Sequence, residues 1–196
     1  MKKRNVALTI LLAFLSWVPS AETALLYEPY LFDTDITITT IDTNTGETIN
    51  LSGAFTAPAD KGTRDYAVFY AENDIEILGN FSGSASASAS NAFSAVAFLA
   101  EHDITITELS GIVNATAKDT GNVVGLLSGF DEKGGSITIE TLSGEVTATN
   151  GSEGNAFGLF AQEHKDLKDS ITITNLSGTI SATAGDKGSA YAACRN

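Results

Sequence analysis

Several residue types are scarce in this chain, and each scarcity narrows what the protein can be. One cysteine, Cys194, occurs among 196 residues, so an intrachain disulfide is excluded and stability must come from packing. Lysine and arginine number 11 against 24 aspartates and glutamates, which leaves a net charge of −13. A surface this acidic repels nucleic acid and anionic lipid, and it favours cations or basic partners. Long amphipathic helical patterns are also missing, and alternation with a period of two predicts strands.

The first 24 residues have the pattern of a secretory signal peptide. A basic start, Lys2 to Arg4, precedes an apolar run from Val6 to Leu15, and small residues follow up to Ala24. The apolar run is too short to cross a bilayer of about 30 Å. The sequence therefore predicts an exported protein, secreted or at the cell surface, with no membrane span in the mature chain.

A repeated stretch organises the rest of the chain. Ile-Thr-Ile followed by Leu-Ser-Gly appears at residues 104–111, 137–144 and 171–178, with a looser copy at 75–83 and a split copy at 36–53. The starts at 36, 75, 104, 137 and 171 are 29 to 39 residues apart. A recurrence of this length is typical of a solenoid, in which each copy forms one coil.

Each copy contains three short apolar patterns. The first, Ile-x-Ile, puts two isoleucines on one side of a strand and the residue between them, mostly threonine, on the other. The second follows Leu-Ser-Gly and alternates apolar with polar residues, as in Val113, Ala115 and Ala117. We expect the apolar residues of both patterns to face inward. The glycine is expected at a corner because it tolerates positive φ.

The third pattern is a short run that is apolar on both faces, such as residues 96–100, 124–128 and 157–161. Periodicity does not tell which of its side chains point inward. Either both sides of this strand are covered, or a band of tyrosine and phenylalanine is exposed.

Three strands per repeat, joined by polar turns, predict an all-β fold: a single-stranded, right-handed parallel β-helix of about five coils. An antiparallel sandwich also has short strands and frequent turns, but it does not require equivalent residues to recur in the same order. The predicted organisation is a signal peptide over residues 1–24, an N-terminal cap segment over 25–34 and the β-helix over 35–196. Ten extra residues after Ile38 predict a hairpin-like excursion in the first coil.

The pattern Ile-Thr-Ile-x-x-Leu-Ser-Gly-x-Val/Ile-x-Ala-Thr, followed by runs such as Asn155 to Ala161, resembles the repeat of bacterial autotransporter passenger and adhesin-like β-helix proteins. The resemblance covers residues 35–194. It implies an exported protein displayed at the cell surface or outer membrane. Such passengers are normally followed by an outer-membrane β-barrel. No set of barrel strands follows these repeats, so the chain is similar to the passenger part alone.

These observations predict a non-enzymatic surface or secreted scaffold that adheres to a cell-surface or extracellular ligand, either a glycan or a protein. No nucleic acid partner and no cofactor are expected. One alternative is a polysaccharide-active β-helix enzyme, because lyases and hydrolases also use this fold. A glycosidase needs two carboxylates about 5–10 Å apart, and a lyase needs a base helped by cations. Beyond the leader, Arg64 and Arg195 are the only arginines.

Outward threonines form the candidate binding row: Thr37, Thr39, Thr105, Thr107, Thr138, Thr172 and Thr174. Alternate residues of a strand lie about 6.6–6.8 Å apart, and coils repeat about every 4.8 Å. A flat array of this kind resembles the ice-binding face of β-helical antifreeze proteins, which is the second alternative function. Glu76, Leu78 and Glu140 interrupt the array, and threonine is in any case a common exposed strand residue.

Acidic residues fall mainly in turns. Glu72 with Asp74, and Glu101 with Asp103, are expected to stack on one another, which makes Ca²⁺ the one metal ion to consider there. Ca²⁺ needs six or more placed oxygens, so solvated acidic turns are the simpler interpretation. The two histidines are expected two coils apart, about 10 Å, which is too far for one metal ion.

The last repeat ends soon after its third strand, so the edges of the strands at 171–174, 179–184 and 190–194 are expected to be open. Unpaired strand edges over an apolar interior recruit further strands. We therefore expect self-association through this C-terminal edge.

Overall fold

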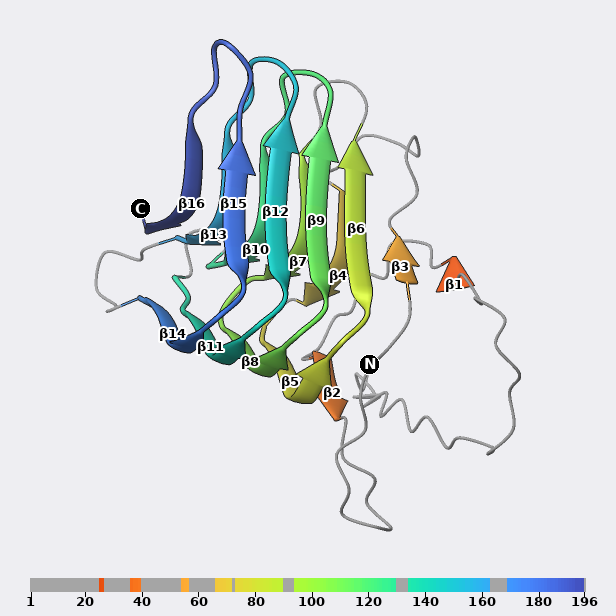
Figure 1. Ribbon diagram of the computed structural model, residues 1–196, viewed down its shortest axis with the longest axis vertical. Helices are drawn as coiled ribbons and strands as arrows, with labels where there is room; N and C mark the ends of the chain where they lie inside the picture. Colours follow the sequence, from red (N-terminus) through yellow and green to blue (C-terminus); the bar gives the residue numbers. More distant parts are fainter. Residues whose placement is uncertain are drawn as a thin grey trace, which may run out of the picture.

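The computed structural model describes residues 25–26, 36–39, 54–56, 66–71, 73–89, 94–129, 134–162 and 169–195. The regular elements in these residues are all strands, and every strand pair is parallel. The strands wind into a solenoid with three sheets and three strands per coil (Figure 1). The predicted parallel β-helix is therefore confirmed, and the antiparallel sandwich is excluded.

Each sheet collects the equivalent strand of successive coils. Sheet A contains β1 (Leu25–Leu26), β3 (Ala54–Thr56), β6 (Ser84–Ala89), β9 (Ile112–Ala117), β12 (Glu145–Asn150) and β15 (Thr179–Thr183). Sheet B contains β4 (Tyr66–Ala71), β7 (Ala95–Ala100), β10 (Val123–Ser128), β13 (Ala156–Ala161) and β16 (Ala190–Arg195). Sheet C contains β2 (Ile36–Thr39), β5 (Ile75–Phe81), β8 (Ile104–Leu109), β11 (Ile137–Leu142) and β14 (Ile171–Leu176).

Along the chain, each coil passes through sheet C, then sheet A, then sheet B. In Figure 1 the strands of sheet A run upward on the near side, the chain crosses over the top, and sheet B lies behind. Successive coils are added toward the left, so the winding is right-handed, as crossovers between parallel strands almost always are. The strands from β5 to β13 form three coils that have stacked neighbours on both sides.

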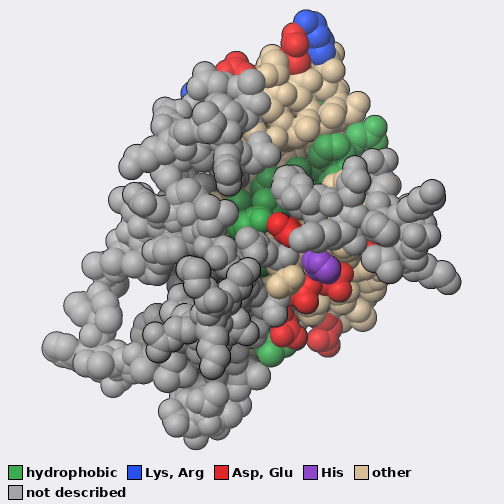
Figure 2. Space-filling view, turned by 180° about the vertical axis from the view of Figure 1, so that it is seen from behind, with side chains coloured by type: hydrophobic (Ala, Val, Ile, Leu, Met, Phe, Trp, Pro, Cys, Tyr) green, Lys and Arg blue, Asp and Glu red, His purple; other side chains and the backbone are tan. Residues whose placement is uncertain are grey.

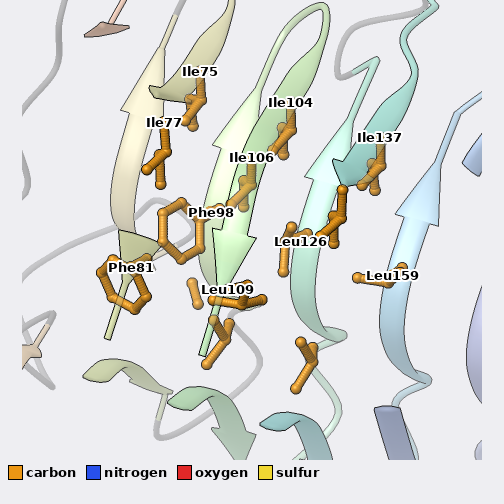
Figure 3. Close-up of a cluster of buried hydrophobic side chains, with 14 of the residues drawn as sticks. Ile75, Ile77, Phe81, Phe98, Ile104, Ile106, Leu109, Leu126, Ile137 and Leu159 are labelled. Atoms are coloured by element: carbon orange, nitrogen blue, oxygen red, sulfur yellow. The ribbon is translucent and has the colours of Figure 1, made fainter. Parts of the chain in front are cut away.

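The Ile-x-Ile pattern sets the register of sheet C. Ile104 pairs with Ile75 on one side and Ile137 on the other, and the same register continues to Ile36 and Ile171. The paired isoleucines of β5, β8 and β11 are fully buried, and Figure 3 shows them stacked along the interior. Because equivalent residues meet in every coil, one short motif builds a continuous core.

The looser second repeat carries one extra residue, and the structure absorbs it as a bulge. The register between β5 and β8 shifts between Ile77 and Asn80, and Gly79 has a φ of 137°. Glycine suits this point because a side chain would be strained there. Pairing then resumes at Asn80 with Glu108.

The interior is lined by isoleucine and leucine from sheet C, and by valine and alanine from sheet A. In the second coil an aromatic residue, Phe81, takes the place of the leucine. Its ring lies 5.6 Å from that of Phe98 in an edge arrangement, and Phe98 stacks on Phe69 at 4.7 Å. These rings fill the early part of the core with favourable aromatic contacts.

The structure shows which side chains of the sheet B strands point inward, which periodicity does not predict. On β10, Val123 and Leu126 pack into the interior clusters, whereas Val124 and Leu127 belong to a separate cluster on the outer face. Between them, a Cβ on Gly125 would lie 2.6 Å from a methyl group of Val146, so this position also faces the narrow interior. Inward positions therefore do not alternate strictly. Every residue of β7 and β10 is nevertheless buried, so both faces of these two strands are covered.

The glycine of Leu-Ser-Gly has a different role from the predicted one. In the described residues, positive φ occurs at other glycines: Gly79, Gly129 and Gly134. A Cβ added to Gly144 would lie 2.0 Å from the carbonyl oxygen of Gly111, and Gly111 meets Gly83 in the same way. The expectation of positive φ is wrong because the backbones of successive coils touch at this corner, where only glycine leaves room.

The structure describes few of the residues on which the N-terminal predictions depend. β1 pairs with β3, so Leu25–Leu26 adds a strand beside the first coil. The signal peptide over 1–24, the rest of the cap segment and the excursion after Ile38 lie outside the described residues. No helix long and apolar enough to cross a membrane occurs in the part of the chain that the structure describes.

Candidate functional site

The acidic turn residues before sheet C bond one coil to the next. The carboxylate Oδ1 of Asp74 accepts a hydrogen bond from the backbone N–H of Asp103 at 2.9 Å. Asp103 Oδ1 accepts from the N–H of Ser136 at 2.7 Å, and Ser136 Oγ accepts from the N–H of Ser170 at 3.1 Å. The sequence placed Asp74 and Asp103 correctly in stacked turns, but it did not reveal this ladder. Their carboxylates satisfy backbone donors that the turn would otherwise leave to solvent.

A second ladder runs along the entry to sheet B, and sequence reasoning missed it. Asn122 Oδ1 accepts from the N–H of Asn155, and Asn155 Oδ1 accepts from the N–H of Ser189, both at 3.0 Å. Each of these residues follows a glycine, and a Cβ on Gly154 would lie 2.0 Å from the carbonyl oxygen of Gly121. The sequence signal that could have predicted this ladder is a glycine followed by asparagine or serine, which recurs just before the third strand of each coil.

The first ladder predicts how Asp103 substitutions behave. Asp103→Ala removes the acceptor for the Ser136 N–H and should lower the free energy of unfolding by about 1 kcal/mol. Asp103→Asn keeps an oxygen in the same place and should retain most of that stability. Urea denaturation followed by circular dichroism measures both variants. Equal losses would show that the charge of Asp103, not its hydrogen bond, stabilises the stack.

The predicted calcium position is not assembled in the described residues. Glu101 is buried, and its carboxylate accepts a hydrogen bond from the Tyr70 hydroxyl at 2.7 Å. His102 is exposed, while Glu72 and His164 lie outside the described residues. The described parts of the chain hold no group of three or more His, Cys, Asp or Glu side chains that could bind a metal ion.

The predicted threonines of β8, β11 and β14 lie on the outer face of sheet C, and the strand register aligns them in two rows with those of β2. The first row reads, coil by coil, Thr37, Glu76, Thr105, Thr138 and Thr172. In the second row, which includes Thr39 at β2, Glu140 lies between Thr107 and Thr174. The register therefore brings three threonines of the first row together and separates them from Thr37 by a glutamate.

A longer uncharged row lies on the outer face of sheet A. Its two lines of residues, in register, are Ser86, Asn114, Thr147 and Ser181, and Ser88, Thr116, Thr149 and Thr183. The Ser181 hydroxyl donates to Thr147 Oγ1 at 3.3 Å, so neighbouring coils also bond through this face. Sequence patterning predicted the outward direction of these side chains but not the length of the rows.

The outer face of sheet B is the apolar one. Two rows of side chains run across the coils in register: Ala67, Val96, Val124, Phe157 and Tyr191, and Tyr70, Leu99, Leu127, Phe160 and Cys194. Viewed from behind, hydrophobic side chains gather on this side of the molecule (Figure 2). We call these two rows the sheet B band.

A groove of about 270 Å³ lies over the sheet B band. Buried valines and leucines of β7 and β10 form its floor, and the half-buried Phe157 and Phe160 line it as well. The two phenylalanine rings lie 4.7 Å apart, and Phe157 stacks on Tyr191 at 5.4 Å. Ser94, Asn122 and Gln162 supply polar groups to the lining. An apolar floor with a few polar groups is the usual composition of a binding groove.

Comparison with family models, curated proteins and solved structures gives no match for this chain. The fold defines the class of protein as a parallel β-solenoid. The resemblance to autotransporter passengers remains a prediction from the repeat motif.

Proposed function

We propose that the chain is a non-enzymatic, exported β-solenoid scaffold that binds a cell-surface or extracellular partner through the groove on the sheet B band. The groove is the observation that carries the proposal. Export rests on the basic start and apolar run of residues 1–24. Similarity of the repeat to autotransporter passengers and adhesins supports display at the cell surface as the site of action.

The contrast between the three outer faces supports this choice of surface. Sheets A and C present mostly hydroxyl, amide and carboxylate groups, as on Thr147 and Glu140. The valines and leucines of the sheet B band are at most 8% exposed, and its accessible apolar groups are the aromatic rings of Phe157, Phe160 and Tyr191. Accessible aromatic rings beside a buried apolar floor are common anchors of an interaction site. The net charge of −13 favours a partner that combines apolar and basic groups.

The use of the turn carboxylates supports a scaffold over an enzyme. Asp74 and Asp103 accept backbone hydrogen bonds between coils, and Glu101 accepts one from Tyr70. Carboxylates held in this way stabilise the stack. A glycosidase would instead require two carboxyl groups that face a shared substrate across a groove.

Substitution of Phe157 and Phe160 by serine should weaken binding without unfolding the solenoid. We would immobilise a panel of acidic and neutral glycans together with a peptide of alternating lysine and leucine, and measure binding by surface plasmon resonance. The double variant should bind its ligand at least about tenfold more weakly, since aromatic anchors dominate such interfaces. Thr147→Ala on sheet A is the matched control and should leave binding unchanged.

Three outcomes would contradict the proposal. Equal binding by wild type and the double variant would show that the groove is not the binding site. Cleavage of a panel glycan that is lost in Glu101→Gln would favour the polysaccharide-active enzyme. Thermal hysteresis that is lost when Thr105 and Thr172 become bulky residues would favour ice binding through sheet C.

A further inference from the structure

Asn150 is a polar residue in a column of the interior where the two preceding coils have alanine. It pairs in register with Ala117, and Ala117 pairs with Ala89. All three side chains are buried, and Asn150 is only 2% exposed. A buried amide is costly unless it is hydrogen-bonded, so the partners of Asn150 show what this residue does.

Three hydrogen bonds fix Asn150 and the residue after it. The side-chain nitrogen Nδ2 donates to the carbonyl oxygen of Gly121 in the preceding coil. The side-chain oxygen Oδ1 accepts from the backbone N–H of Ser152 at 2.8 Å. The backbone N–H of Gly151 donates to the carbonyl oxygen of Ala117, also in the preceding coil, at 2.9 Å. The bonds to Gly121 and Ala117 therefore persist only while the two coils are stacked.

Asn150 and Gly151 also form a chemically reactive pair, the only Asn-Gly sequence in the chain. In a flexible chain the glycine nitrogen attacks Cγ of the asparagine, because glycine has no side chain to obstruct the approach. A new C–N bond closes a succinimide ring, the bond from Cγ to Nδ2 breaks, and ammonia leaves with the proton of the glycine N–H. Water then opens the ring at either carbonyl group and gives aspartate or isoaspartate.

The stacked coils oppose this reaction at each of the reacting atoms. The Gly151 nitrogen must give up its proton, which is held in the hydrogen bond to Ala117. Cγ of Asn150 must turn toward that nitrogen, but Gly121 and Ser152 hold both polar atoms of the amide. The side chain is also buried, which keeps water away from Cγ. All of these restraints are lost together when the corner between the two coils opens.

We propose that Asn150–Gly151 is a deamidation site that the stacked coils hold unreactive and that reacts when this corner opens. Aspartate at position 150 would put a buried carboxylate oxygen against the carbonyl oxygen of Gly121, where the N–H donor now lies. Isoaspartate would add a carbon atom to the backbone, so the strand could not regain its register. Deamidation thus makes the opening permanent. The site is separate from the groove on the sheet B band and does not depend on what binds there.

Peptide mass spectrometry of the full chain tests the site. The protein is incubated at mildly alkaline pH, in native buffer and in denaturing guanidinium chloride, and isoaspartate at residue 150 is followed over time. The native reaction should be at least about tenfold slower than the denatured one, because it requires local opening of the stack. Asn114 and Asn175 are internal references, since alanine and leucine follow them. Both should react slowly in either buffer, because a side chain hinders the attack.

Variants separate the effect of the fold from that of the local chemistry. Gly144→Ala forces the coils apart at the other end of β12 and should speed the native reaction at least about threefold. Thr147→Ala on the outer face of β12 is its matched control and should change that rate less than about twofold. Gly151→Ala should slow the denatured reaction at least about fivefold, because its Cβ hinders the attack. If Gly144→Ala does not fold, wild type in guanidinium chloride below the unfolding midpoint replaces it, and its rate should rise with denaturant.

Asn150→Asp reproduces the product and should lower the denaturation midpoint more than Asn150→Ala, which restores the alanine of the preceding coils. Equal rates in native and denatured protein would overturn the proposal, and so would the absence of isoaspartate at residue 150 in denatured protein. A native rate that responds neither to Gly144→Ala nor to denaturant below the midpoint would overturn the control by coil stacking. An Asn150→Asp variant as stable as Asn150→Ala would overturn the permanence of the opening.

Discussion

Ile106→Asp is expected to unfold the solenoid or to leave it severely destabilised. Ile106 is fully buried between Ile77 and Ile139 of the neighbouring coils. An aspartate there would bury a charge with no partner, at a cost of about 3–5 kcal/mol or more. That is a large fraction of the roughly 5–15 kcal/mol that stabilises a typical domain. Ile139→Asp should have the same effect, and urea denaturation followed by circular dichroism measures both.

Thr138→Ala is the matched control for these two variants. Thr138 lies between the buried Ile137 and Ile139 on β11, but its side chain is exposed. Its loss should change the free energy of unfolding by less than about 1 kcal/mol. If the aspartate and alanine variants lose the same stability, the assignment of inner and outer faces in sheet C is wrong.

Gly144→Ala is expected to destabilise the protein, although alanine is ordinarily the better residue in a strand or turn without positive φ. A Cβ at this position would lie 2.0 Å from the carbonyl oxygen of Gly111 and 2.6 Å from the backbone carbon of Ser110. No side chain can rotate away to relieve these contacts, so the coils themselves must separate. Overpacking that forces backbone shifts costs about 1–3 kcal/mol, measurable as a lower midpoint in urea denaturation.

Gly151→Ala supplies the comparison for this effect. Gly151 is exposed, and the nearest atom to its added Cβ is the carbonyl oxygen of Lys118 at 3.4 Å. Alanine there should be neutral, or stabilising by up to about 1 kcal/mol because it lowers the conformational entropy of the unfolded chain. A similar response at Gly144 and Gly151 would mean that backbone contact between coils is not the reason for the glycine in Leu-Ser-Gly.

The repeat motif carried most of the fold. Ile-Thr-Ile at residues 104–106 and 137–139 could be assigned to stacked strands because a period of two within the motif, together with a nearly constant spacing between copies, is the pattern of a stacked coil. The inward direction of Val146 and Ala148 followed from the same alternation, and both are fully buried. Function was harder to predict from the sequence than the fold, because binding depends on a surface to which several coils contribute.

Errors and omissions arose where residues of different coils meet. The sequence explains Gly144 by the conformational freedom of its own backbone, whereas glycine is required there because the carbonyl oxygen of Gly111 in the neighbouring coil leaves no room for a Cβ. Asp103 lies in an exposed turn, as the sequence predicts, but the hydrogen bond that its carboxylate accepts from the backbone N–H of Ser136 is not evident from the sequence. Both contacts join residues 33 positions apart, and local sequence patterns do not predict contacts between such distant residues.

The sequence by itself determined the coil: its length, its three strands, and the inward side of the Ile-x-Ile and Val/Ile-x-Ala segments, because these follow from local alternation and repetition. Tertiary structure alone decided which side chains of sheet B remain outside. Leu126 and Leu127 are adjacent and equally apolar, yet one packs in the core and the other joins the outer band. The physical reason is the width of the interior: even a Cβ at Gly125 would lie 2.6 Å from a methyl group of Val146 in sheet A, so there is room for only part of an apolar strand.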